Sequence, residues 1–412
     1  PMHLSVTGSG TQVAGTAQTI TITAYDGFGN LADRYVGAQL VKFIGALPSP
    51  APNHYPNTDG TSFGSNMTLN FDNGVATTSM SLFKEETAYI MVSATSQFID
   101  NGFTGFKYTP DRSATPLQVE VSQSAPSYLA VTGSTTATAG IPQTITITAY
   151  DAYNNQATHY DGSKTLKITG ANSSPDPSTA PTAGGSVLGS DLSLTFTNGS
   201  ATTELVLYKS ESATIVAADP STGGIQTGSG YGLAVTVDPA SVNYFAITGT
   251  TSSTTAGVPQ TITVKAYDAF NNQATNYTSD ATLVFSGAST SPALSVGTIP
   301  TVTNKNSVAV NFGSNTLVHF TNGVATGTMT LYNVETAHIG ATCGSITTPS
   351  DPIDYRFAVT LASAPCDYLA ITGNPVQTAG TEQTITITAY DDFNNVVTGY
   401  AGEHTLTFAG AS

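Results

Sequence analysis

The chain has 412 residues, and its composition excludes several classes of protein before any motif is considered. Only 9% of the residues are charged, and 27 acidic against 11 basic residues leave a net charge of −16. A nucleic-acid binder needs a basic face to displace phosphate counterions, and an anionic membrane surface attracts the same charge, so we expect neither partner. No apolar run approaches the roughly 18 residues of a bilayer-spanning helix, so we expect no membrane insertion by this region.

The residue usage is typical of a protein that works outside the cell. Threonine accounts for 69 residues and glycine for 39, whereas lysine and arginine together account for 11. Two cysteines in a chain of this length exclude a disulfide-stapled miniprotein and a cysteine zinc site. We therefore expect an extracellular or cell-surface location.

A repeated phrase divides the chain into modules. A short strand phrase such as YLAVTG opens each copy, and an alternating strand such as LQVEVSQSAP closes each of the three full copies. Between them stands a longer phrase, which reads AGTAQTITITAYDGFGN, AGIPQTITITAYDAYNN, AGVPQTITVKAYDAFNN and AGTEQTITITAYDDFNN. We expect three full modules and the first strands of a fourth, at residues 1–124, 125–240, 241–363 and 364–412.

Within a module the hydrophobic residues alternate with a period of two, which indicates strands. In QTITITAY, Ile20, Ile22 and Ala24 fall on one face and threonines on the other. About seven such strands per module, with turn residues at the joints and no amphipathic helix, predict an all-β fold. We expect immunoglobulin-like antiparallel sandwiches, joined in tandem by short linkers. The Asn198-Gly199 pair between two alternating runs further predicts a β-hairpin.

The repeated phrase resembles the bacterial immunoglobulin-like repeats of very large secreted and surface proteins. The resemblance rests on A-G-x-x-Q-T-I-T-x-x-A-Y-D-x-[FY]-x-N, followed in the third copy by NYTSDATLVFSG, and it covers the whole chain. The modules are more distantly similar to the stalks of invasin-like adhesins and to surface-layer domains. The resemblance implies an extracellular structural or adhesive role. The sequence departs from those repeats by frequent Asn-Asn turns and by long insertions after the third strand.

No group of residues in the sequence predicts catalysis. The six histidines are scattered without metal-ligand spacing, and the H-E-x-x-H and phosphate-loop motifs do not occur. We therefore expect a non-enzymatic protein with no catalytic residue and no required cofactor.

An aspartate followed by asparagine ends the second long strand of each copy, and two interpretations remain open. Asp and Asn side chains stabilise turns by bonding their own backbone. The aspartates could instead be calcium ligands at the module junctions, although six to eight oxygens would require Glu86, Glu211 or Glu335, or a neighbouring module, to contribute. The four aspartates are Asp26, Asp151, Asp268 and Asp391.

Three kinds of covalent feature are candidates. Cys343 and Cys366 flank the junction of the third and fourth modules, where a disulfide would fix the angle between them; two free thiols are the alternative. Threonine ladders fit a solvated strand face, and they could also carry O-linked sugar or bind ice. N-linked glycan acceptor sequences occur at Asn66, Asn172, Asn198 and Asn276.

The insertions at residues 45–65, 170–190 and 287–314 differ in sequence and length between modules. Their Pro, Ser, Asn and Gly content is typical of exposed loops, and loops on a rigid scaffold are where contacts are made. The first insertion favours protein–protein contact because it contains the large residues His54, Tyr55, Pro56 and Phe63.

Two functional hypotheses follow. In the first, the modules form a rod that assembles, with copies of itself or with other surface proteins, into a filament, sheath or surface layer. In the alternative, the chain is a spacer or stalk of a large adhesin whose binding tip lies outside it. The fourth copy stops after its third strand, so we expect either that the natural chain continues or that a neighbouring chain completes this module.

Overall fold

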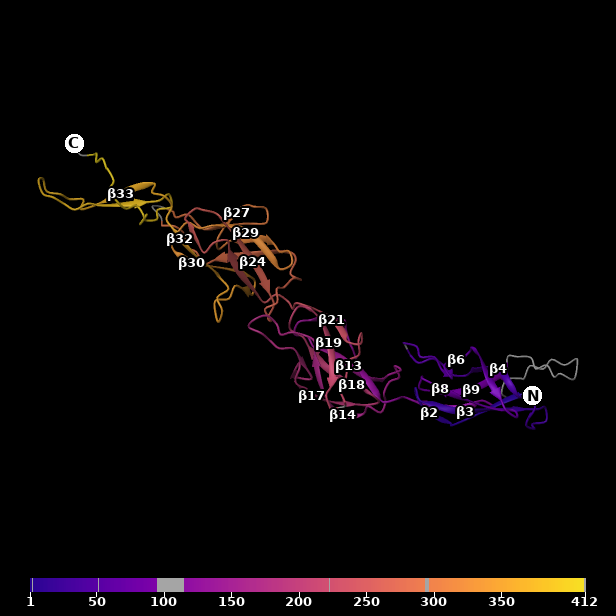
Figure 1. The fold of residues 1–412 in the computed structure, drawn as a ribbon. Helices are drawn as coiled ribbons and strands as arrows, with labels where there is room; N and C mark the ends of the chain where they lie inside the picture. Colours follow the sequence, from indigo (N-terminus) through magenta and orange to yellow (C-terminus); the bar gives the residue numbers. More distant parts are fainter. Residues whose placement is uncertain (2, 51, 95–114, 222, 293–295, 411–412) are drawn as a thin grey trace.

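The molecule is a series of four groups of strands that lie end to end, with the two termini at opposite ends (Figure 1). The computed structural model describes residues 1, 3–50, 52–94, 115–221, 223–292 and 296–410, so residues 51 and 293–295 of the predicted insertions lie outside the described part. The described residues contain strands, turns and loops, and no helix among them could cross a bilayer. The all-β tandem architecture predicted from the repeats is confirmed.

The first module is a two-sheet sandwich of immunoglobulin type. One sheet has the order β1-β3-β8-β5-β6, and the facing sheet has the order β2-β10-β9-β4-β7. Neighbouring strands are antiparallel, except that β2 runs parallel to β10. The strands are β1 (His3–Thr7), β2 (Thr11–Val13), β3 (Ala17–Tyr25), β4 (Gly37–Ile44), β5 (Asn57–Thr58), β6 (Thr61–Ser62), β7 (Asn66–Phe71), β8 (Val75–Ser81), β9 (Glu86–Ala94) and β10 (Leu117–Ser122).

The second module repeats this topology. The sheet β11-β13-β18-β15-β16 faces the sheet β12-β21-β19-β14-β17, and β20 lies beside β19. The strands are β11 (Pro126–Thr132), β12 (Thr136–Thr138), β13 (Gln143–Asp151), β14 (Gly162–Thr169), β15 (Thr182–Ala183), β16 (Ser186–Val187), β17 (Asp191–Phe196), β18 (Ser200–Val206), β19 (Ser212–Asp219), β20 (Ile225–Gln226) and β21 (Leu233–Asp238).

The third module has the same two sheets, and the short strand β31 joins them by pairing with both β22 and β30. Of the fourth module, the hairpin β33–β34 is formed. The strands are β22 (Tyr244–Gly249), β23 (Ser253–Thr255), β24 (Gln260–Tyr267), β25 (Asp280–Ser286), β26 (Thr301–Thr303), β27 (Ala309–Asn311), β28 (Asn315–His319), β29 (Val324–Thr330), β30 (Thr336–Cys343), β31 (Ile346–Thr347), β32 (Phe357–Ala362), β33 (Tyr368–Thr372) and β34 (Thr386–Tyr390).

The core of each module lies between its two sheets, where the alternating residues meet. Ile20, Ile22 and Ala24 are fully buried, as their alternation with threonine predicts. The chain has no Trp, and an edge-on pair of tyrosine and phenylalanine rings occupies each full core instead. The three pairs have similar centroid distances: Tyr35–Phe71 at 4.8 Å, Tyr160–Phe196 at 4.8 Å and Tyr277–Phe320 at 4.9 Å.

The predicted Asn198-Gly199 turn is present, but the predicted hairpin is wrong. Both residues have positive φ, 49° and 76°, and a single bridge joins Thr197 to Ser200. The strands then separate, because β17 pairs with β14 in one sheet and β18 pairs with β13 in the other. The alternation gives each strand one apolar face, and the two faces meet across the core. The turn therefore carries the chain from one sheet to the other.

Candidate functional site: the module junction

The repeated Asp-x-aromatic-x-Asn segment lies where one module meets the next. We name these segments the junction turns; they are residues 26–30, 151–155, 268–272 and 391–395. Each follows the second long strand of its module, and the last three contact the module that precedes them in the chain. The junction is therefore built from the most strongly repeated phrase of the sequence.

The aspartate of each of these three turns is fully buried and fastens the turn to the linker. Asp151 Oδ1 accepts hydrogen bonds from the backbone N–H groups of Tyr153, at 2.8 Å, and Asn155, at 2.9 Å. Its Oδ2 accepts from Asn155 Nδ2 and from the backbone N–H of the linker residue Ser124, both at 2.9 Å. The same four N–H donors surround Asp268 and Asp391, with Ala240 and Ala364 as the linker donors.

The asparagine that ends the turn binds the backbone of the preceding module. Asn155 Nδ2 donates to Phe83 O at 2.8 Å, and Asn155 Oδ1 accepts from the backbone N–H of Glu85 at 2.9 Å. Its side chain is 3% exposed, and a buried amide without such partners would be costly. The same two bonds join Asn272 to Tyr208 O and the Ser210 N–H, and Asn395 to Tyr332 O and the Val334 N–H.

The aromatic residue of each turn packs against the preceding module. The Tyr153 ring lies 5.1 Å from the ring of Phe83, and it covers Gly15, the glycine of the first Ala-Gly pair. Phe270 packs in the same way on Tyr208 and Gly140, and Phe393 packs on Tyr332 and Gly257, with ring distances of 4.9 and 5.0 Å.

Glycine is required beneath each ring for two reasons. Gly15, Gly140 and Gly257 have φ of 77°, 77° and 79°, a region that L side chains rarely adopt. A Cβ atom built on Gly257 would lie 2.6 Å from Phe393, and on the other two it would fall closer still to the ring. The glycine of the repeated Ala-Gly pair thus forms the surface on which the aromatic ring of the next module packs.

A second asparagine reaches the long insertion of the preceding module. The amide of Asn271 donates to Pro177 O at 2.9 Å and accepts from the Tyr244 hydroxyl, also at 2.9 Å. Burial raises the pKa of Tyr244, with a hydrogen bond to Tyr355 as a smaller cause, so the phenol stays a donor. The corresponding bonds join Asn154 to Pro50 O and the Tyr128 hydroxyl, and Asn394 to Pro292 O and the Tyr368 hydroxyl.

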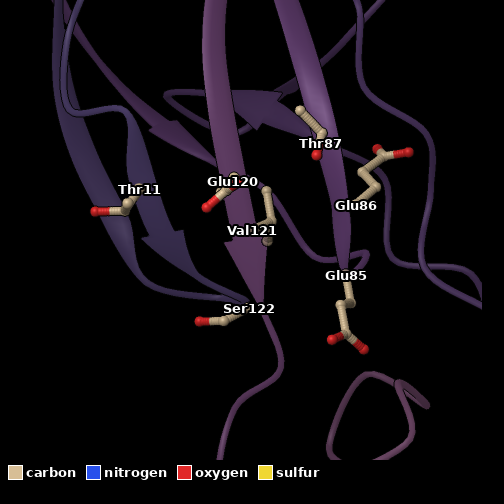
Figure 2. Close-up of a pocket in the computed structure, with 7 residues that line it drawn as sticks. All are labelled: Thr11, Glu85, Glu86, Thr87, Glu120, Val121 and Ser122. Carbon is tan, nitrogen blue, oxygen red and sulfur yellow. The ribbon is translucent and has the colours of Figure 1, made fainter.

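The glutamates considered as calcium ligands hold the insertions instead. Glu86 Oε1 accepts from the backbone N–H of Leu47 at 2.7 Å. Glu211 accepts from Asn172 and Glu335 from Ser289 in the same way, at 2.7 and 2.6 Å. Glu86 also lines, with Glu85 and Glu120, an open hollow of about 390 Å³ in module 1. Figure 2 shows the side chains that line it.

The four aspartates predicted as calcium ligands accept hydrogen bonds from N–H groups of their own turns, as the turn interpretation expects. N–H groups surround Asp151, Asp268 and Asp391, whereas calcium binds oxygen atoms. Asp26 accepts three bonds from Phe28 and Asn30, and these bonds, those from Asn30 foremost, lower the pKa of Asp26. Within the described residues, no group of three or more His, Cys, Asp and Glu is placed to hold a metal ion. The calcium site stays a prediction from sequence.

The remaining candidate residues are the two cysteines and the four glycan acceptor asparagines, none of which belongs to a junction turn. Cys343 and Cys366 are free thiols, the alternative to the disulfide. The four acceptor asparagines Asn66, Asn172, Asn198 and Asn276 are exposed, although Asn172 Nδ2 donates to Glu211 and Asn276 Nδ2 to Pro239 O. Glycosylation stays a prediction.

Three of the four large residues in the first insertion are used within the chain. His54 lies 5.1 Å from Tyr153 at the junction, and Phe63 stacks on the core residue Phe43. Pro56 is buried, and Tyr55 is 57% exposed. His54 is exposed despite this contact, so the interpretation of this set as a surface for another protein is left with Tyr55 and the exposed part of His54.

We expect Asn155→Ala to open the first junction, because Phe83 O and the Glu85 N–H would lose their buried partner. Each such bond is worth about 1 kcal/mol, so amide exchange at Glu85 should accelerate about tenfold or more. Asn30→Ala is the matched control, since it removes the same amide from the exposed turn of module 1. Equal exchange at Glu85 in both variants would contradict the role of Asn155.

We expect Gly140→Ala to displace the Phe270 ring from the second junction. The added Cβ meets the ring, and the positive φ alone costs about 1–2 kcal/mol. Gly380→Ala is the control, because Gly380 has a φ of 78° and open space around it. Amide exchange at Ser210 should rise with Gly140→Ala and not with Gly380→Ala; no change in either variant would show that the ring needs no glycine.

The turn interpretation also predicts the effect of metal removal. Treatment with EDTA should leave amide exchange at Glu85, Ser210 and Val334 unchanged, because N–H groups already occupy the carboxylates. Faster exchange in EDTA that calcium reverses, and magnesium does not, would instead establish the calcium site.

No protein-family model and no curated protein sequence match the chain. Among solved structures, the Escherichia coli adhesin FdeC is 18% identical with a TM-score of 0.30, over 87% of this chain and 97% of that chain. The Yersinia pseudotuberculosis adhesin InvE is 15% identical with a TM-score of 0.23, over 57% and 60%. Domains 4–9 of the surface layer protein SbsC are 14% identical with a TM-score of 0.20, over 90% and 49%. Because these values are low, we argue the function from the chain's own contacts.

Proposed function

We propose that the chain is a stiff, non-enzymatic spacer outside the cell, which holds its modules in a fixed order and orientation. The observation that carries this proposal is the repetition of one junction geometry. The three ring pairs have interplanar angles of 58°, 60° and 53° at nearly equal distances. A junction repeated so closely gives each module the same orientation relative to the one before it, and the series becomes a rod.

The junction resists bending because it holds three parts of the chain at once: the end of the preceding sandwich, its insertion and the linker. The asparagine amide and the aromatic ring hold the end of the preceding sandwich, and the second asparagine holds the insertion. The aspartate holds the linker itself. Bending that separates the modules must therefore break these hydrogen bonds or expose the aromatic ring.

The spacer or stalk interpretation is favoured over lateral assembly. The argument for assembly rested on large residues in the first insertion, and His54, Pro56 and Phe63 have contacts within the chain. Assembly into a filament, sheath or surface layer is the alternative, and Tyr55 and His54 are the exposed residues of that set that would mediate it. The exposed acceptor asparagines and the threonine-rich strand faces fit a surface glycoprotein.

The proposal predicts a rod in solution. Each module adds roughly 30–40 Å, so the full chain should measure roughly 100–150 Å by small-angle X-ray scattering, with a narrow distribution of shapes. The double variant Tyr153→Ala, Phe270→Ala should keep its folded modules but behave as a flexible string. The control is Tyr55→Ala, which removes an exposed aromatic side chain away from the junction turns and should leave the rod unchanged.

Two results would overturn the proposal. A broad distribution of shapes in the scattering of the unaltered chain would show that it is not a rod. Regular lattices or filaments seen by electron microscopy, and lost in the Tyr55→Ala variant, would establish the assembly alternative.

A further inference from the structure

The junction turn of module 1 presents an uncovered aromatic ring. Phe28 is 94% exposed, whereas Tyr153, Phe270 and Phe393, at the same position of the later turns, are partly buried against a preceding module. Exposure of a whole phenylalanine ring at a turn is unfavourable in water. In three of four cases the chain itself shows what covers this position.

The polar groups of the same turn are also open. Asn30 is exposed, whereas Asn155, Asn272 and Asn395 are buried by their bonds to the preceding module. Asp26 has the three donors of its own turn, Phe28 N–H, Asn30 N–H and Asn30 Nδ2. The later aspartates have a fourth, from the linker. The turn of module 1 therefore has the same internal bonds as the later turns, with the side that faces a preceding module in those turns open to solvent.

We propose that the exposed turn of module 1 binds the C-terminal end of another immunoglobulin-like module of this repeat type, joined to it in tandem. The partner must offer a glycine of positive φ beside an aromatic ring, together with the free backbone C=O of that aromatic residue and the free N–H of the residue two positions after it. It must also supply a linker N–H to Asp26, and this requirement favours a tandem partner over a separate molecule.

A second copy of the chain does not meet these requirements. Its glycines Gly15, Gly140 and Gly257 already lie under the rings of the following modules. Gly380 is open, with no ring within 4 Å of its Cβ position.

The proposed contact lacks one element of the later junctions. Gly29 stands where they have Asn154, Asn271 and Asn394, so no amide is available for the partner's insertion. His3, stacked on Tyr25, stands where they have the donor tyrosine. We expect a contact of the same geometry but fewer hydrogen bonds. The inference deepens the proposed spacer function and rests on it.

The test adds a second copy of residues 241–365 directly before Pro1 of the full chain. Ala364 of the added copy then precedes Asp26 by 27 residues, the same spacing that separates the native Ala364 from Asp391. The added copy carries Val334→Ile, which keeps the backbone N–H and distinguishes its peptides by mass. Amide exchange at this position should be slowed to within about tenfold of that at the native Val334. Phe28→Ala in the extended chain should abolish the protection, while Tyr89→Ala, an exposed aromatic residue on β9, should not.

The outcomes separate the two proposals. Fast exchange in the added copy beside slow exchange at the native Val334 would overturn the inference and leave the spacer function standing. Fast exchange at both positions, and at Ser210, would overturn the rod itself. Concentration-dependent dimerisation of the unextended chain, abolished by Phe28→Ala, would also overturn the inference, because the partner would then be a second copy.

Discussion

The structure depends on one buried carboxamide at each junction. Asn155, Asn272 and Asn395 bond the aspartate of their own turn on one side and the backbone of the preceding module on the other. An amide has both a donor and an acceptor end, so one side chain can satisfy a carbonyl and an N–H of the same loop. Because the group is buried, separation of the modules must rehydrate all of these partners together. This makes the junction cooperative rather than a hinge.

The glycine beneath the aromatic ring adds a steric constraint to the hydrogen bonds of the buried asparagine. At Gly140, the backbone N–H donates to Leu207 O, which ties the turn to the segment that follows β18, while the missing side chain leaves space for Phe270. A turn that needs positive φ and a surface that needs no Cβ select the same residue. Sequence repetition of Ala-Gly therefore follows from contacts between modules as much as from the fold of one module.

The fold was predictable from the sequence because its signals are local. The alternation around Ile20 and Ile22, the Asn-Gly turn and the repeat length depend on neighbours in the chain. The partner sheet of β18 was not predictable, since a turn fixes the chain direction but not the sheet that each strand joins. For Asp151 the sequence left turn chemistry and a calcium site open, and it did not identify the groups that Asp151 and Asn155 bind. Their partners Ser124, Phe83 and Glu85 lie 27 to 72 residues away and are mostly backbone groups.

The backbone character of these partners also explains how the insertions can vary. Pro50, Pro177 and Pro292 lie in insertions of different sequence, yet each offers a carbonyl oxygen to the next module. Every residue has a carbonyl, so the contact constrains the path of the loop and not its side chains. Glu86, Glu211 and Glu335 fix the start of that path. The bond from the second asparagine can therefore persist while the loop sequence changes, and the contact of His54 with Tyr153 is an additional one made by a loop side chain at the first junction.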